Sequence, residues 1–271
     1  MRRVKVDIHN HLQTSSDMSK IDSEKVINYA KQVLGPGGIL GIVNMKDRRY
    51  EDFIMNVDSA IPTIDLERGD LYGTGLNNFL LVKCQEIATQ QGHLLAIAMP
   101  KNESVDDGMS IEDTICEVKE LEGIICVDHP FGWGGAGNYL LEHPKYLESG
   151  KIDAWETHNG ETALYIPGKS NLFANKKSQR VYDKQIRVSC PVAELWSSDG
   201  HSVTEIGSSY TELLMPEDYQ DIDLSATLKS AIKQTRFIGI EGKKTNSYVG
   251  AVRHAVALSG IIGMEKLHSR K

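Results

Sequence analysis

The stretch Val4-Lys5-Val6-Asp7-Ile8-His9-Asn10-His11 opens the chain as a short apolar strand that runs directly into two histidines. Side chains two residues apart on an extended backbone point the same way, so His9 and His11 can face one metal ion together. A single His-x-His pair at a strand end is common by chance. The pair gains meaning because later strands of the same chain also end in His or acidic residues.

Strands alternate with helices along most of the chain. Residues 23–34 have the apolar spacing of an amphipathic helix, and residues 39–44 form an apolar run typical of a buried parallel strand. The same criteria predict further strands at 79–86, 93–99, 123–128, 152–156, 192–196 and 203–206, and helices at 110–121, 170–184, 224–235 and 248–260. Alternation of this kind predicts an α/β fold made of βαβ units.

The length and composition fit a single domain. A chain of 271 residues can form one α/β barrel, and 40% hydrophobic with 25% charged residues is ordinary for a soluble globular protein. We therefore expect one domain over 1–271, with 215–271 as a helical C-terminal extension packed on the barrel.

Cysteine usage, apolar runs and charge suggest the setting. None of the four cysteines lies in a CxxC pair, which indicates reduced thiols and a cytoplasmic protein. The sequence opens Met-Arg-Arg-Val-Lys-Val-Asp, without the apolar stretch typical of a signal sequence, and no apolar run approaches the roughly 20 residues that span a bilayer, so we expect no membrane association. The formal net charge of -7 disfavours a nucleic-acid polymer as partner.

Histidine and carboxylate residues recur at the carboxyl ends of the predicted strands. In parallel βα barrels the loops at these ends open on one face, which holds the active site. Side chains far apart in the sequence are therefore expected to converge there. Imidazole mixed with carboxylate suits zinc, manganese or iron, and a shared carboxylate can hold two ions about 3.5–4 Å apart.

Taken in order, these motifs resemble those of the PHP (polymerase and histidinol phosphatase) superfamily, and nearly the whole chain takes part. The matching segments are His9-Asn10-His11, Ser16-Asp17, Gln85-Glu86-Ile87, Gly92-His93, His129-Pro130, Glu156-Thr157-His158-Asn159-Gly160 and Ser198-Asp199-Gly200-His201. The resemblance implies a distorted (β/α)7-type barrel with its metal site at the carboxyl ends of the strands.

The resemblance also implies a ligand set for two, and up to three, divalent ions. One ion would be held by His9, His11, Glu86 and Asp199. A second ion would share Glu86 and take His93 and His129, and a third would use Asp17 and His201. Glu156 and Asn159 would orient these ligands without binding the ions themselves.

One motif departs from the family. The second strand of family members ends in Thr-Asp-His, whose His binds the third ion, but residues 42–47 here read Ile-Val-Asn-Met-Lys-Asp. The third position is therefore expected to be weak or empty. Lys46, Arg48 and Arg49 follow at the active-site end, where they would either clamp a substrate phosphate or form a solvated charged loop.

The function expected from the sequence is metal-dependent phosphoester hydrolysis, with a small phosphorylated metabolite or nucleotide as substrate. The ions would activate water and neutralise phosphate oxygens, Asp199 would hold an ion, and His201 would protonate the leaving group. Two alternatives remain open at this point. One is amidohydrolase-like cleavage of a C–N or C–O bond, and the other is a non-catalytic, metal-binding regulatory PHP domain.

Overall fold

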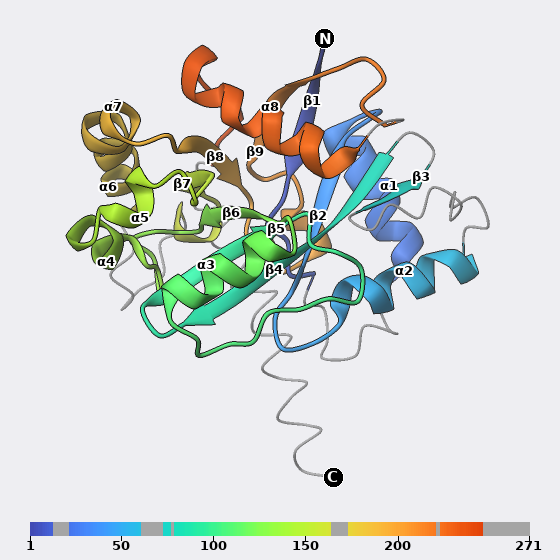
Figure 1. Ribbon diagram of the computed structural model, residues 1–271. Helices are drawn as coiled ribbons and strands as arrows, with labels where there is room; N and C mark the ends of the chain where they lie inside the picture. Colours follow the sequence, from blue (N-terminus) through green and yellow to red (C-terminus); the bar gives the residue numbers. More distant parts are fainter. Residues whose placement is uncertain (13–21, 61–72, 77–78, 164–172, 221–222, 246–271) are drawn as a thin grey trace.

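A strongly curved sheet forms the centre of the molecule. The computed structural model describes residues 1–12, 22–60, 73–76, 79–163, 173–220 and 223–245 (Figure 1). Within these residues ten strands form one sheet in the order β10-β9-β1-β2-β4-β5-β6-β7-β8, with β3 paired to β4. The strands are β1 (Arg2–Asp7), β2 (Ile39–Asn44), β3 (Gly73–Leu76), β4 (Phe79–Thr89), β5 (Gly92–Ile97), β6 (Ile124–Val127), β7 (Ala154–Asn159), β8 (Ala193–Ser197), β9 (Tyr210–Met215) and β10 (Glu241–Lys243).

The sheet nearly closes into a barrel between β1 and the segment after β8. Asn10 and Gly200 form a parallel bridge there. The Asp7 carboxylate accepts hydrogen bonds from the Ser198 hydroxyl (2.7 Å), the Ser198 amide (3.0 Å) and the Gly207 amide (2.8 Å). The α/β class and the barrel-like sheet predicted from the sequence are therefore confirmed.

Strand direction differs from the expected pattern of parallel strands. Two parallel groups, β1-β2-β4 and β6-β7-β8, are separated by β5, which is antiparallel to both β4 and β6. The reason lies in the connection. Only residues 90–91 separate β4 from β5, and a parallel neighbour needs a crossover of about a dozen residues or more.

Helices cover the outer face of the barrel and one of its ends. They are α1 (Ser23–Leu34), α2 (Arg49–Ala60), α3 (Ile111–Glu120), α4 (Gly137–Glu142), α5 (Lys145–Glu148), α6 (Ala174–Val181), α7 (Arg187–Ser189) and α8 (Leu224–Ile238), with short turns η3 (Glu161–Ala163), η5 (Tyr182–Ile186) and η6 (Val203–Glu205). The longer helices begin at side-chain caps, since Asp22, Ser110 and Asp223 each accept a hydrogen bond from a backbone amide three residues on.

The barrel interior is apolar below the strand ends. Val82 and Cys84 of β4, Ile124 and Cys126 of β6, and Ala193 and Leu195 of β8 belong to one buried cluster. Leu224, Leu228, Ala231 and Ile232 of α8 join the same cluster, and α8 crosses the end of the barrel at which β1 starts (Figure 1). The polar residues thus lie at the opposite end of the barrel, where the parallel strands have their carboxyl ends.

The predicted C-terminal helix at 248–260 lies outside the described residues. Among the residues that the structure does describe, no helix combines the length and apolar character needed to cross a membrane.

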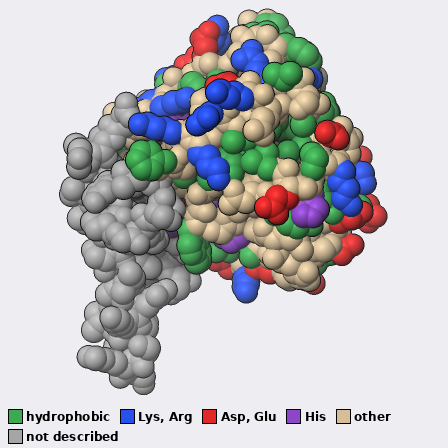
Figure 2. All heavy atoms as spheres, turned by 90° about the vertical axis from the view of Figure 1, so that its left-hand side faces the viewer, with side chains coloured by type: hydrophobic (Ala, Val, Ile, Leu, Met, Phe, Trp, Pro, Cys, Tyr) green, Lys and Arg blue, Asp and Glu red, His purple; other side chains and the backbone are tan. Residues whose placement is uncertain are grey.

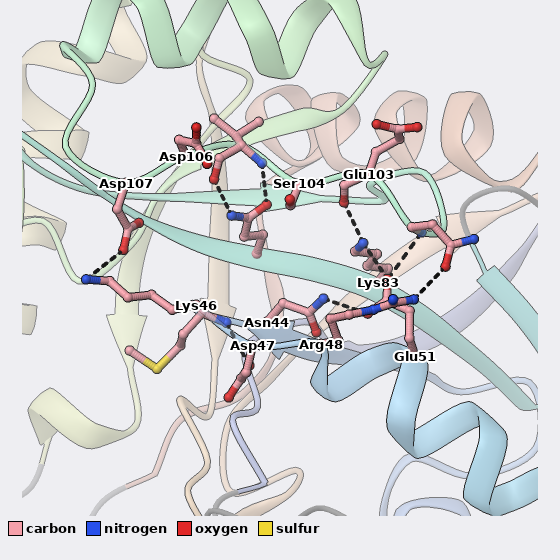
Figure 3. A pocket seen from close by; sticks show the side chains of 14 residues that line it. Asn44, Lys46, Asp47, Arg48, Glu51, Lys83, Glu103, Ser104, Asp106 and Asp107 are labelled. Carbon is pink, nitrogen blue, oxygen red and sulfur yellow. Dashed lines mark hydrogen bonds and ion pairs between the residues drawn. The ribbon is translucent and has the colours of Figure 1, made fainter.

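A buried ion pair joins the outer face of the sheet to α2. The Lys83 ammonium lies 2.5 Å from Glu51 Oε1 and donates to the Glu103 carbonyl oxygen at 2.6 Å (Figure 3). The second Glu51 oxygen accepts from the Asn44 amide at 2.8 Å. Burial alone would raise the pKa of Glu51, but the bonds from Lys83 and Asn44 outweigh it and hold this pKa below its usual value.

Removing the lysine should destabilise the fold strongly. Lys83→Met leaves a buried carboxylate without its cation, and loss of one partner of a buried pair costs about 3–5 kcal/mol. Urea unfolding should show this loss as a lower midpoint with an unchanged slope. The double variant Lys83→Met/Glu51→Leu should recover part of it, and a single variant as stable as the wild type would contradict the role of the pair.

Candidate metal centre

The predicted ligands converge at the carboxyl ends of the strands. His9 and His11 follow β1, Glu86 and His93 lie on the β4–β5 hairpin, and the remaining ligands follow β6 and β8. Of the sequence-predicted set, only Asp17 lies outside the described residues. The other predicted ligands, except His93, belong to neighbouring groups of His and carboxylate side chains, and His93 lies beside Glu86.

The first group consists of His9, His11 and Asp199. The Nε2 atoms of the two histidines are 3.2 Å apart, and Asp199 Oδ1 lies 3.4 Å from His9 Nε2 and 3.2 Å from His11 Nε2. Two ligand atoms about 2.0–2.1 Å from a tetrahedral ion lie about 3.3 Å apart. The three side chains thus have the spacing that one ion would impose.

Glu86 connects the first group to a second. Its Oε2 lies 3.2 Å from His11 Nε2, whereas its Oε1 lies 3.2 Å from His129 Nε2 and 2.6 Å from His93 Nδ1. Although the His93 contact is close, its geometry is not that of a hydrogen bond, and His93 Nδ1 has no hydrogen-bond partner within the described structure. Each oxygen of one carboxylate therefore faces a different set of imidazoles, as a bridging ligand requires.

A third group combines Glu161, Asp199 and His201. Asp199 and His201 were predicted from the sequence, whereas Glu161, on η3, was not. The only sign of it in the sequence is its position directly after the Glu156-to-Gly160 motif.

Glu156 and Asn159 hold the ligands in place. Glu156 Oε2 accepts hydrogen bonds from the His129 amide (2.6 Å) and from the Asn159 side chain (2.9 Å), which also donates to Asp199 Oδ2 at 3.0 Å. A register shift within β7, between Glu156 and His158, accompanies this arrangement. Both side chains lie where a supporting role was expected.

Asp128 is a further candidate ligand that sequence reasoning missed. It is fully buried, its Oδ2 lies 3.2 Å from His129 Nε2, and it groups with His9, Glu86 and His129. Its position beside His129, at the end of β6, was the available signal. Burial raises the pKa of Asp128 to about 6 despite the nearby His129, and a bound cation would stabilise its charged form.

The electrostatics of the group favour cation binding. Burial would lower the pKa of His9, but Asp199 and Glu156 outweigh it and raise that pKa to about 10. Burial likewise opposes the charged form of His129, yet Asp128 and Glu86 hold its pKa well above the usual value. The carboxylates thus attract positive charge so strongly that protons bind the imidazoles where a metal ion is absent.

The hydrogen-bonding census agrees with metal binding. Within the described part of the chain, both Asp128 oxygens and Asp199 Oδ1 are buried in this group and have no hydrogen-bond partner. Buried polar atoms normally find partners, so their concentration in one place indicates a missing ligand. Imidazole and carboxylate donors fit zinc, manganese or iron.

The predicted cations occupy a different position. Lys46 and Arg48 line a cavity of about 470 Å³ with Lys83 and Gln85. Lys46 lies 3.6 Å from Asp107, and Arg48 donates to Asn102 at 2.9 Å (Figure 3). Successive side chains of a strand point to opposite faces of the sheet. Gln85 therefore points to the outer face of β4, where it lines this cavity, whereas Glu86 points to the metal centre.

Arg49 contacts the backbone of the His9-Asn10-His11 segment. It is buried, contacts Asp47 at 2.5 Å and donates to the His11 carbonyl oxygen at 3.0 Å. Asn44, at the end of β2, donates to Glu51 and accepts from the Tyr50 amide through its side chain.

Comparisons with known proteins place the fold. No protein-family model matches the chain, and no curated protein matches its sequence. The chain is similar in structure to PsfC from Pseudomonas syringae PB-5123, with a TM-score of 0.62, 13% identity and coverage of 98% of this chain and 100% of that one. These two folds correspond over their whole lengths.

A second similarity is to the lesion-specific endonuclease PfuEndoQ from Pyrococcus furiosus, with a TM-score of 0.52 and 14% identity. The match covers 89% of this chain but only 58% of the endonuclease. Another structure of endonuclease Q, matched equally well, contains a 27-mer duplex with an abasic lesion at the active site.

The endonuclease complex corrects one prediction. We expected a small phosphate ester as partner and considered a nucleic-acid polymer disfavoured, yet the structure of endonuclease Q, which is similar in fold over 58% of its chain, contains a DNA duplex at the active site. The prediction relied on the net charge of the whole chain, which says nothing of how charge is distributed over the surface.

Glu86→Ala should remove more metal than any single histidine substitution, because its carboxylate faces both imidazole sets. Elemental analysis of protein never exposed to chelator should show at least about one equivalent of transition metal in the wild type and a large loss in the variant. Glu120→Ala, at the exposed end of α3, is the matched control. Full metal content in Glu86→Ala, together with loss in His129→Ala, would contradict the bridging assignment.

Metal binding should release protons. His9, with its pKa raised to about 10, is protonated in the metal-free protein at pH 7, and a coordinating nitrogen must lose that proton. Affinity should therefore fall as the pH is lowered. Calorimetric titration of zinc into chelator-treated protein, repeated in buffers of different ionisation enthalpy, measures the release, and an enthalpy independent of buffer would contradict it.

Proposed function

We propose that the chain is a metal-dependent phosphodiesterase of the PHP superfamily and that its substrate is a nucleic-acid strand. The observation that carries the proposal is the division of the Glu86 carboxylate between two adjacent imidazole sets. Paired ions that share a carboxylate are the usual apparatus for in-line displacement at phosphorus. The endonuclease of similar fold supports phosphodiester cleavage over attack on a C–N or C–O bond.

The ligands divide into two binding positions. His9, His11, Asp199 and one oxygen of Glu86 would hold the first ion, while the other oxygen, with His93, His129 and Asp128, would hold the second. When bound, such ions lower the pKa of water and neutralise the phosphate oxygens.

His201 is placed to handle the leaving-group proton. Its Nδ1 lies 3.0 Å from the Asp199 carbonyl oxygen, which can only accept, so Nδ1 carries the hydrogen of the neutral ring. Nε2 is then the nitrogen that exchanges a proton or joins Asp199 and Glu161 at the third position. Hydrolysis forms one P–O bond to water and breaks another, so Nε2 would take up the proton that the water loses and give it to the departing oxygen.

An exposed aromatic ring beside the centre supports a nucleic-acid substrate. Trp133 is 76% exposed, and its ring meets that of His93 edge-on at 6.1 Å. Gly134 has a φ of 75°, and a Cβ there would lie 2.6 Å from the His93 ring, so the loop that presents Trp133 is fitted against a metal-site residue. Aromatic side chains of this kind stack nucleobases at about 1–3 kcal/mol per base.

Cleavage of a labelled oligonucleotide tests the proposal. Protein loaded with manganese or zinc should cut the strand, chelator should abolish cleavage, and Glu86→Ala should lack activity. Trp133→Ala should raise the KM for the oligonucleotide about fivefold or more, in line with the loss of one stacked base. Absence of cleavage of both the oligonucleotide and bis(p-nitrophenyl) phosphate by the loaded protein would overturn the proposed function.

A further inference from the structure

Three lysines on one side of the molecule contact neutral groups in place of acids. Lys244 lies 4.1 Å above the Trp196 ring and donates to the Gln179 amide oxygen at 3.0 Å. Lys177 lies 4.0 Å above Phe131 and donates to the Asn138 amide oxygen at 2.8 Å. Lys176 lies 5.8 Å from the Phe173 ring centre. In the described structure no carboxylate forms an ion pair with any of the three.

Several lysines elsewhere are paired with acids. Lys46, Lys83, Lys119 and Lys145 each have a carboxylate within ion-pair distance. By contrast α6, with the sequence Ala-Asn-Lys-Lys-Ser-Gln-Arg-Val, contains three basic residues and no acidic one. Lys and Arg side chains accordingly gather on the upper part of the face seen in Figure 2, the side on which α4–α7 lie in Figure 1.

A cavity of about 350 Å³ lies between α6 and the segment after β10. Lys176 and Lys244 line it, together with His158, Asn175 and Gln179. The His158 side chain is buried, with only 7% of its surface exposed. Within the described structure its Nε2 has no hydrogen-bond partner. A buried ring nitrogen without a partner at a cavity wall indicates that a polar ligand belongs there.

Two hydrogen bonds link this cavity to the metal centre. The Asn175 side chain donates to the Asn159 carbonyl oxygen at 2.9 Å, and the Asn159 side chain donates to Asp199 Oδ2 at 3.0 Å. The Lys177 ammonium lies over Phe131, which is two residues beyond the metal-site His129. The three lysines thus extend from the edge of the metal centre to the cavity.

We propose that Lys177, Lys176, Lys244 and the cavity lined by His158 bind backbone phosphates of the nucleic-acid strand beyond the cleaved bond. The proposal rests on the proposed function for the identity of the strand. Lysine ammonium groups bind phosphate as point charges without sequence preference. The aromatic rings beneath them hold the ammonium groups in place without neutralising them.

Binding of a labelled 20-nucleotide single strand to chelator-treated protein, in which cleavage is abolished, tests this track. Fluorescence anisotropy would give Kd over a range of salt concentrations, with a denaturing gel to confirm that the strand stays intact. Lys176→Ala/Lys244→Ala should raise Kd about tenfold and flatten the salt dependence, because each lost phosphate contact reduces its slope by about 0.7 for a single strand. Lys176→Arg/Lys244→Arg should keep most of the affinity.

The matched control is Lys25→Ala/Lys145→Ala, which removes the same charge from other exposed sites. Lys145 also lies over an aromatic ring, Tyr146 at 4.7 Å, but it has Glu112 at 3.7 Å. Equal loss of affinity in this control, or unchanged affinity and slope in Lys176→Ala/Lys244→Ala, would overturn the track. Binding that depends on these lysines, without any cleavage, would contradict the proposed function but support the track. Cleavage together with binding that does not depend on these lysines would support the proposed function but contradict the track.

Discussion

The structure depends on keeping several carboxylates and imidazoles buried together without net uncompensated charge. Glu86, Asp128 and Asp199 lie at most 8% exposed, where an isolated carboxylate would be too costly to keep ionised. Their charge is balanced by the surrounding histidines or by bound cations. Burial raises the pKa of Asp128 to about 6 despite His129, whereas nearby histidines hold the pKa of Asp199 well below its usual value. The pKa of each carboxylate in this buried group therefore depends on the charges of its neighbours.

The barrel makes this concentration of charge possible. Side chains of a strand alternate between faces, so the residue two positions beyond an interior apolar residue reaches the mouth of the barrel. Cys84 leads to Glu86, Cys126 to Asp128 and Ala154 to Glu156 in this way. The tight hairpin between β4 and β5 then places His93 beside Glu86, because Ala88 pairs with His93 and Glu86 pairs with Leu95.

Sequence reasoning found most of this centre because its signals are local. A His-x-His pair after a strand, or a carboxylate at a strand end, is visible without knowledge of strand order. Strand direction was less accessible, since it depends on a two-residue connection that the predicted strands at 79–86 and 93–99 did not reveal. The placement of Lys46 and Arg48 could not be predicted either, because whether a loop turns inward or outward depends on the burial of neighbours such as Lys83 and Glu51.

The expectation about the partner failed for a related reason. Net charge is a sum over the chain, but recognition of a polyanion depends on which charges lack local compensation. Some lysines lie beside carboxylates that neutralise them, as in the Lys119 and Asp153 pair. On α6 and after β10 the ammonium groups instead lie over aromatic rings and beside amide oxygens, although the charges of Glu194 and Asp183 still act on Lys244. The proposed phosphate track would give an acidic protein a basic surface beside its candidate metal centre, and the partner of each lysine, more than the number of lysines, determines where that surface lies.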